Sequence, residues 1–165
     1  MGRVSVKLEK QAADYHFKAF NSAGLSIDID DATAYEDGKG NGVGPMQLLV
    51  MAIGGCSGVD IVSILLKARQ KVTSFDIRVD GDKPDGVSPS VFESISVHYA
   101  LSGELDESKV RRAIDLSLGK YCSVARMLEK SATIRFDFSI NGKEYSGGSI
   151  YGARVGPITR FWAFL

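Results

Sequence analysis

The feature that most constrains the fold of this chain is a long apolar segment after Pro45. The stretch from Met46 to Lys71 contains no further proline, and Pro45 fits the first turn of a helix, where its missing N–H costs nothing. Apolar side chains fall on almost every side of the predicted helix: Leu48, Leu49, Val50, Met51, Ile53, Val59, Ile61, Val62, Ile64, Leu65 and Leu66. A helix that is apolar all round is buried in a large core, in an oligomer interface or in a membrane.

A membrane span is one alternative, because about 20 apolar residues can cross a bilayer. Four polar residues inside the segment argue against it: Gln47, Ser57, Asp60 and Ser63. A carboxylate inside a bilayer is costly, and the amphipathic strands predicted on both sides of the helix need an aqueous sheet. We therefore expect no membrane contact. A buried helix of this length in a chain of 165 residues predicts that a second subunit covers it.

Alternating apolar residues predict strands on both sides of this helix. Before it, three runs predict a meander with a turn at residues 21–24: Val4 to Leu8, Tyr15 to Phe17 and Leu25 to Ile29. After it, three runs predict further strands: Phe75 to Val79, Ile95 to Leu101 and Ile134 to Ile140. Asn141-Gly142 then offers a tight hairpin turn into Glu144 and Tyr145.

Two shorter helices are predicted between the last two strands. Asp106 or Ser108 can cap a helix that runs to about Leu118, where Gly119 ends it. A third helix is expected to begin near Ser123.

The segment at residues 30–44 is acidic and rich in glycine, and it has no apolar period, which predicts a mobile loop. The chain length fits one domain, which we place at residues 1–145. The tail at residues 146–165 has no clean period, so it is unassigned.

Composition excludes several classes of function. The chain has 20 Lys and Arg against 20 Asp and Glu, so it lacks the basic excess of a nucleic-acid binder. Its first residues lack the apolar core of a secretory signal, and we therefore expect a cytoplasmic protein, in which thiols stay reduced. Two cysteines cannot build a disulfide framework or supply four soft ligands for structural zinc, so we expect no metal. A redox role for the thiols competes with simple burial.

Cys56 lies in the sequence Gly54-Gly55-Cys56-Ser57-Gly58, in the middle of the predicted long helix. Each interior glycine costs a helix about 0.5–1 kcal/mol relative to alanine, so the cluster needs an explanation. One explanation is close packing of another helix, with Cys56 as a small buried apolar residue. The other is that the glycines clear space for a substrate to reach the sulfur.

Cys122 lies near the predicted start of the third helix. The exposed N–H groups at a helix N-terminus stabilise a thiolate, which predicts a lowered pKa and a reactive thiol. The alternative is again a buried cysteine. The two cysteines are 66 positions apart, so the sequence alone does not place them in contact.

Taken together, these elements resemble the OsmC/Ohr family of osmotically induced and organic-hydroperoxide-resistance proteins. The similarity rests on the strand meander, on Gly-Pro-Met-Gln-Leu-Leu-Val-Met-Ala-Ile-Gly-Gly-Cys-Ser-Gly-Val-Asp, and on Lys-Tyr-Cys-Ser-Val after the second helix. It extends from about Val4 to Tyr145 and is nearest to the less characterised subgroup with Gly-Gly-Cys-Ser-Gly. The resemblance implies an α+β fold whose antiparallel sheets wrap around long central helices in an intertwined homodimer.

The resemblance also implies a function. Cys56 would attack a peroxide as a thiolate and become a sulfenic acid, and Cys122 would resolve it into a disulfide. An external dithiol, such as a lipoyl group, would then reduce the disulfide, so no bound cofactor is expected. The active sites would lie at the dimer interface.

The sequence departs from the family pattern near the reactive thiol. Family peroxidases have a Glu directly after the proline that opens the helix, where this chain has Met46 followed by Gln47. They also have an early arginine, whereas this chain has none between Arg3 and Arg69. Asp60 and Arg126, each one helical turn beyond a cysteine, are possible modulators of the thiolates, because a carboxylate would repel a thiolate and a guanidinium would attract it.

Two functions remain open at this stage. The first is an organic hydroperoxide reductase that binds its substrate in an apolar pocket lined by Met46, Gln47 and Met51. The second is a dimer of the same fold without efficient peroxidase activity, which binds or senses a small apolar or electrophilic molecule.

Overall fold

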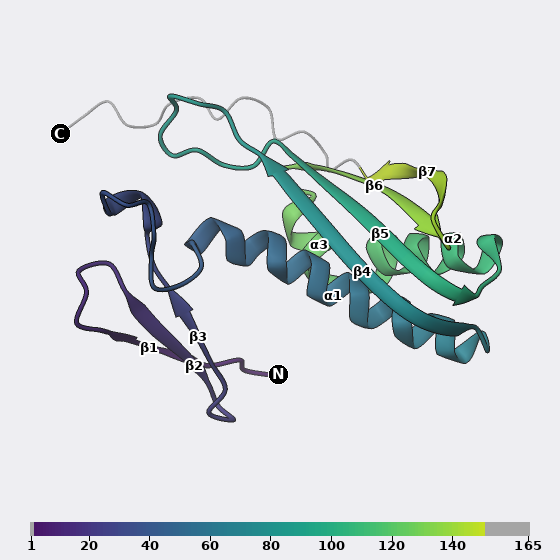
Figure 1. Cartoon of the computed structure of the whole chain (residues 1–165), viewed down its shortest axis with the longest axis horizontal. Coiled ribbons are helices and arrows are strands. Elements are labelled where there is room, and N and C mark those ends of the chain that lie inside the picture. Colours follow the sequence, from purple (N-terminus) through teal and green to yellow (C-terminus); the bar gives the residue numbers. More distant parts are fainter. Residues whose placement is uncertain (1, 151–165) are drawn as a thin grey trace. The chain divides into compact units, whose positions relative to one another are not determined.

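The computed structural model describes residues 2–150 of the chain (Figure 1). Its strands are β1 (Val6–Lys10), β2 (Phe17–Asn21), β3 (Ser26–Ile29), β4 (Lys71–Asp82), β5 (Ser94–Glu104), β6 (Thr133–Ile140) and β7 (Lys143–Ile150). Its helices are α1 (Pro45–Lys67), α2 (Glu107–Leu116) and α3 (Ser123–Leu128), with a 3-10 turn η1 (Ala32–Ala34) and a π-helical turn η2 (Ser117–Tyr121). The chain divides into two compact units between Leu49 and Val50, so α1 begins in the first unit and continues in the second.

The first unit contains the predicted three-stranded antiparallel meander. β2 lies in the middle, and Phe17 pairs with Lys10 of β1 and with Ile29 of β3. Among residues 2–49, Asp30 is the only buried residue. This unit therefore has no hydrophobic core of its own. A small sheet needs an apolar face packed against another layer to be stable, so the meander cannot be stable alone.

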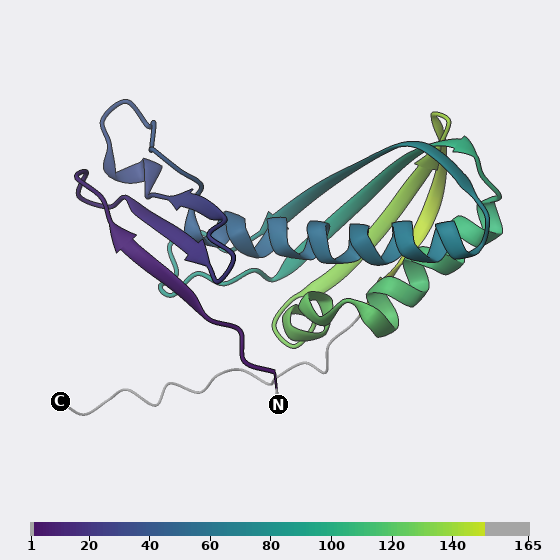
Figure 2. The ribbon, with the colours of Figure 1, turned by 90° about the horizontal axis from the view of Figure 1, so that it is seen from below.

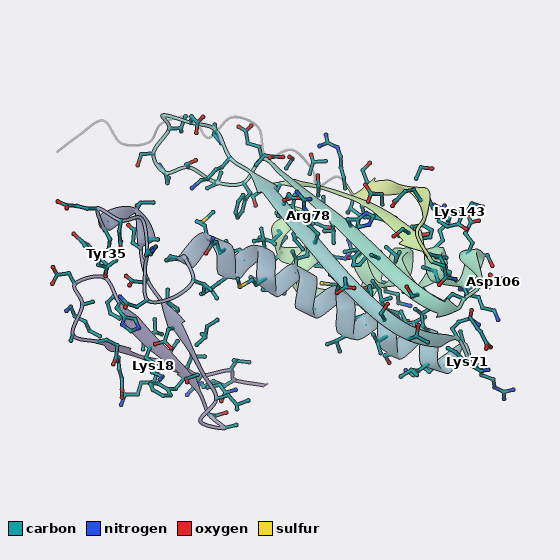
Figure 3. The ribbon with its side chains drawn as sticks, in the orientation of Figure 1. Lys18, Tyr35, Lys71, Arg78, Asp106 and Lys143 are labelled. Carbon is teal, nitrogen blue, oxygen red and sulfur yellow. The ribbon has the colours of Figure 1, made fainter. Side chains whose placement is uncertain are left out.

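The segment at residues 30–44 is a loop with one short helical turn, η1, and hydrogen bonds organise it, whereas its mobility stays a prediction. The Asp30 carboxylate accepts hydrogen bonds from the backbone N–H and the side-chain amide of Asn41 (2.8 and 2.9 Å) and from the Tyr35 hydroxyl (3.1 Å). Burial by itself would raise the pKa of Asp30, but these hydrogen bonds outweigh burial and lower it. Tyr35, labelled in Figure 3, lies just after η1. A buried carboxylate therefore organises the segment in place of an apolar period.

The second unit is a four-stranded sheet in the order β4-β5-β6-β7, with helices against one face (Figure 2). The β4–β5 and β6–β7 pairs are antiparallel, whereas β5 and β6 are parallel. Parallel neighbours need a crossover, and α2, η2 and α3 provide it. The core contains the apolar faces predicted for β5 and β6: Ile95, Val97, Tyr99, Leu101, Ile134, Phe136, Phe138 and Ile140. The α+β class is therefore confirmed.

Two glycines let α1 approach β4 closely. A Cβ atom at Gly58 would lie 2.6 Å from Cδ1 of Ile77, and one at Gly54 would lie 3.1 Å from Cγ2 of Val79. Gly55 faces open space. Close packing therefore explains Gly54 and Gly58, but the element that packs there is a strand and not a second helix.

The face of α1 that does not pack on the sheet is apolar, and no other element of the second unit covers it within the described residues. Ile61 is completely buried, whereas Met51, Val59 and Leu66 are 50%, 72% and 65% exposed. By length and composition alone α1 could cross a membrane, and one of its faces packs closely on β4.

Two helix ends differ from the predictions. α1 ends at Lys67 and not near Lys71, because Arg69 takes a left-handed conformation (φ 55°) and β4 begins soon after it. The second helix ends at Leu116, and the chain continues through η2 instead of stopping at Gly119. The third helix begins at Ser123, as predicted.

Other local predictions are confirmed. Asp106, labelled in Figure 3, caps α2 by accepting a hydrogen bond from the backbone N–H of Lys109 (3.1 Å). Asn141 and Gly142 both take positive φ (50° and 80°), as a tight turn between β6 and β7 requires. β7 continues past Tyr145 to Ile150, and the rest of the tail, residues 151–165, lies outside the described residues.

Candidate functional site

The two cysteines lie on different elements of the second unit. Cys56 is in the middle of α1 and is half-buried, whereas Cys122 immediately precedes α3 and is completely buried. The crossover from β5 brings the chain back to α1, where the Ser117 hydroxyl lies 3.3 Å from the carbonyl oxygen of Ser57. The topology thus joins two positions that the sequence could not place together.

A carboxylate lies beside the thiol pair. The sulfur atoms of Cys56 and Cys122 and a carboxylate oxygen of Asp60 all lie within 4.8 Å of one another. Both cysteines are free thiols. Asp60 is one helical turn beyond Cys56, so the two side chains share a face of α1. The structure therefore brings together three of the residues singled out in the sequence.

The two thiols differ in their surroundings. Burial is the main cause that raises the pKa of Cys122 to about 12, and the hydrogen bond and the charge of Cys56 act in the same direction. The backbone N–H of Ala125, 3.4 Å from the Cys122 sulfur, acts in the opposite direction but is outweighed. The expectation of a lowered pKa at the start of this helix is therefore wrong, because the sulfur has lost its contact with water. Cys122 is a neutral thiol at physiological pH.

A buried hydrogen-bond chain supports the site from α1 to the sheet. The Tyr99 hydroxyl donates to Oγ of Ser57 (2.9 Å), and the Ser57 hydroxyl in turn donates to the carbonyl oxygen of Ile53 (2.7 Å). Burial holds the pKa of Tyr99 well above its usual value. The Ser117 hydroxyl also donates to Oδ2 of Asp60 (3.3 Å). No pattern in the sequence predicted these hydrogen bonds, although a buried tyrosine hydroxyl usually finds a partner.

The two charged residues near the thiols differ in whether they have a partner of opposite charge. Arg126 donates to both carboxylate oxygens of Glu129 (3.0 and 3.1 Å) and to the carbonyl oxygen of Gly119. Within residues 2–150, Asp60 takes part in no ion pair. The roles of Asp60 and Arg126 as modulators stay predictions.

The residues predicted to bind substrate lie along α1. Met46 is half-buried, and Oε1 of Gln47 accepts a hydrogen bond from the backbone N–H of Gly44 (2.8 Å), which helps to cap the start of the helix. Both belong to the first unit, whereas Met51 belongs to the second, and their roles in binding stay predictions.

A pocket of about 310 Å³ opens beside Asp60. Its lining is partly polar and consists of Asp60, Ser63, Ile64, Lys67, Leu116 and Tyr121. It gives small solutes a path to the carboxylate that adjoins the thiol pair.

The fold and the site define a class of protein: an α+β chain with one thiol on its central helix and a second, buried thiol at the end of a crossover. Two sulfur atoms this close can form a disulfide after a small movement, since the bond is about 2.05 Å long. The family model described as "OsmC-like protein" matches residues 38–137. The chain belongs to the OsmC/Ohr family, as the sequence motifs indicated.

Known relatives agree with this assignment. The protein YhfA of Escherichia coli (strain K12) is 41% identical over 97 residues, which make up 58% of this chain and 72% of YhfA. A crystal structure of a hypothetical protein from Aquifex aeolicus VF5 is similar with a TM-score of 0.75 and 31% identity, over 86% of this chain and 98% of that chain. An organic hydroperoxide resistance protein OsmC from Legionella pneumophila shares the fold at 12% identity, with a TM-score of 0.62 over 84% of this chain and 98% of that one.

Proposed function

We propose that this chain is a thiol-dependent hydroperoxide reductase that uses Cys56 and Cys122. The observation that carries the proposal is the approach of two free sulfur atoms to within 4.8 Å, on elements far apart in the sequence. The family gives further support, since its structural relatives include proteins named for resistance to organic hydroperoxides.

The reaction has three balanced steps. The Cys56 thiolate attacks the outer peroxide oxygen, the O–O bond breaks, and the alkoxide takes up a proton to leave as an alcohol. The Cys122 thiol then attacks the sulfur of the Cys56 sulfenic acid, which forms a disulfide and releases water. An external dithiol, such as a lipoyl group, gives two electrons and two protons to the disulfide by thiol–disulfide exchange.

The surroundings of the two thiols support these roles. Cys56 is half-buried, so part of its surface is open to a peroxide, and it lies on the same helix face as Asp60, which lines the pocket. Cys122 is completely buried, and its raised pKa keeps it protonated until a sulfenic acid forms beside it. A resolving thiol in this position can convert the sulfenic acid to a disulfide and so protect it from further oxidation. We place the reaction in the cytoplasm, where dithiol reductants are available.

The alternative function is binding or sensing of a small apolar or electrophilic molecule. It needs one reactive thiol at most and gives no reason for a second sulfur atom beside Cys56. The thiol pair therefore favours the reductase.

The experiment that tests the reductase is a thiol count on the reduced full chain, in the presence of a chelator, after addition of cumene hydroperoxide or hydrogen peroxide. We expect two thiols to be lost per chain in the wild type. Cys122→Ser should lose one and accumulate a sulfenic acid that dimedone traps, and Cys56→Ser should react far more slowly. If neither peroxide consumes two thiols, or if Cys56→Ser reacts at the wild-type rate, the proposal is wrong.

We also propose that the chain acts as a homodimer. The uncovered apolar face of α1 and the lack of a hydrophobic core in the first unit support this arrangement. Val59 is 72% exposed in the single chain, so Val59→Asp should leave the subunit folded and prevent association. Light scattering should give a dimer for the wild type and a monomer for this variant, and a wild-type monomer at micromolar concentration would contradict the proposal.

A further inference from the structure

The proposed reaction leaves one residue of the site without a role. Asp60 places a carboxylate oxygen within 4.8 Å of both sulfur atoms, and no cation of residues 2–150 pairs with it. A carboxylate at this distance repels a thiolate, so it is a poor neighbour for a thiol that must ionise to attack peroxide. A bound cation would reverse this relation, because both thiolates and the carboxylate would then face a positive charge.

The three ligand atoms match the requirements of a thiophilic divalent ion. Zinc is bound by thiolate sulfur at about 2.3 Å and by carboxylate oxygen at about 2.0–2.2 Å. In tetrahedral geometry these bond lengths place the ligand atoms about 3.5–3.8 Å from one another. The atoms of Cys56, Asp60 and Cys122 lie within 4.8 Å of one another, so movements of about 1 Å, from side-chain rotation, would complete the set.

We propose that the reduced chain binds one Zn²⁺ through Cys56, Asp60 and Cys122, with water as the fourth ligand. Binding releases one proton from each thiol and transfers no electrons. The sequence predicted no metal because the chain cannot supply four soft ligands, but an open site with three protein ligands and a water does not need them. This inference goes beyond the proposed reductase, with which it shares the two cysteines.

The residues around the ligands are arranged to hold them. The Ser117 hydroxyl donates to the Asp60 carboxylate (3.3 Å), and the Ala125 N–H lies 3.4 Å from the Cys122 sulfur. Hydrogen bonds of this kind orient ligands, and their loss commonly weakens metal binding about 10- to 100-fold. The pocket of about 310 Å³ at Asp60 gives the ion and its water a way in, past the polar side chains of Ser63 and Tyr121.

Zinc binding and peroxide reduction would exclude each other. The ion occupies both sulfur atoms, so zinc should slow the reaction of Cys56 with peroxide. When peroxide does oxidise the pair, the two thiolates with their bound Zn²⁺, one hydroperoxide and two protons give a disulfide, an alcohol, water and free Zn²⁺.

The test uses the reduced, metal-free full chain without oxygen, titrated with Co²⁺ and then with Zn²⁺. We expect one Co²⁺ per chain, with thiolate-to-cobalt charge-transfer absorption and the intense visible bands of tetrahedral cobalt, both lost on displacement by Zn²⁺. Cys56→Ser and Cys122→Ser should each weaken the charge-transfer band and the affinity. Asp60→Asn should lower the affinity by about tenfold or more, and Ser117→Ala by about tenfold. Asp76→Asn, an exposed carboxylate of β4, is the matched control and should change nothing.

The outcomes separate this proposal from the reductase. Weak cobalt spectra of octahedral type, or binding that is indifferent to both cysteine substitutions, would overturn the metal site even if peroxide consumes two thiols. Tight, cysteine-dependent binding in a protein that does not react with peroxide would support the metal site and refute the reductase.

Discussion

Replacing Asp60 by asparagine removes the negative charge beside the thiol pair and keeps the shape of the side chain. The asparagine oxygen can still accept the hydrogen bond that the Ser117 hydroxyl donates (3.3 Å). If Asp60 repels the Cys56 thiolate, this substitution should speed the reaction of Cys56 with peroxide in metal-free protein.

The size of the effect follows from the geometry. Two unit charges 4.8 Å apart repel by about 3.5 kcal/mol at an effective dielectric constant of about 20, and by about 0.9 kcal/mol in bulk water. Cys56 and Asp60 are both half-buried, so the true repulsion lies between these limits. Since about 1.4 kcal/mol is a factor of ten, these two limits correspond to factors of about 5 and 300. A more stable thiolate is a weaker nucleophile, with a Brønsted coefficient of about 0.4–0.5, which leaves a net acceleration of about 2- to 20-fold.

The assay is the second-order rate of thiol loss with cumene hydroperoxide at pH 7, in the presence of a chelator, for the wild type, Asp60→Asn and the control Asp76→Asn. A slower reaction of Asp60→Asn would refute the repulsion and would instead identify Asp60 as a proton acceptor. An equal rate would mean that solvent screens the carboxylate completely.

Three further predictions test the packing and the buried groups. The pKa of Cys122 is raised from 9.0 to about 12 in the folded chain, so its contribution to stability is present below pH 9 and is lost as the pH rises toward 12. Urea unfolding should therefore show a steeper loss of stability over this range for the wild type than for Cys122→Ser, and parallel curves would contradict the buried thiol. Gly58→Ala should cost about 1–3 kcal/mol by forcing a Cβ atom against Cδ1 of Ile77, and Ile77→Val in the same chain should recover part of the loss, whereas additive losses would argue against this contact. Asp30→Ala should expose residues 30–44 to limited proteolysis, as should protonation of Asp30 below pH 3.8, and unchanged cleavage would show that the carboxylate does not organise the segment.

The sequence predicted those parts of the fold that depend on a regular period. Alternation on β5 placed Tyr99 on the buried face correctly, because a strand repeats every two residues. The partner of the Tyr99 hydroxyl, Ser57, lies on α1, and no local pattern connects the two residues. Asp30 shows the same limit, since a buried carboxylate with hydrogen bonds from residues up to 11 positions away leaves no apolar signal.

In the candidate site, too, the local features could be predicted from the sequence and the contacts between distant residues could not. Each cysteine was a recognisable candidate by itself, and Asp60 was predicted to share a face with Cys56 because the two are one helical turn apart. The approach of Cys122 to Cys56 depends on the crossover through α2 and η2, and no residue pattern predicted the π-helical turn η2. The environment of Cys122 was misjudged for the same reason, because the loss of water around its sulfur comes from tertiary packing and not from its place before α3.

The charges at the site affect both the proposed peroxide reductase and the proposed zinc site. The resemblance implies a guanidinium beside the reactive thiol, Cys56. Arg126, which is the arginine nearest in sequence to the second thiol, Cys122, instead donates hydrogen bonds to Glu129. When Cys56 loses its proton, two negative charges therefore lie within 4.8 Å of each other, with no ion-pair partner for Asp60 in residues 2–150. Such a pair is stabilised by taking up a cation or by keeping the thiol protonated. A metal-free reductase should thus be slow, and a thiophilic ion should bind the site in competition with peroxide, so the rate of thiol oxidation should fall as the zinc concentration rises.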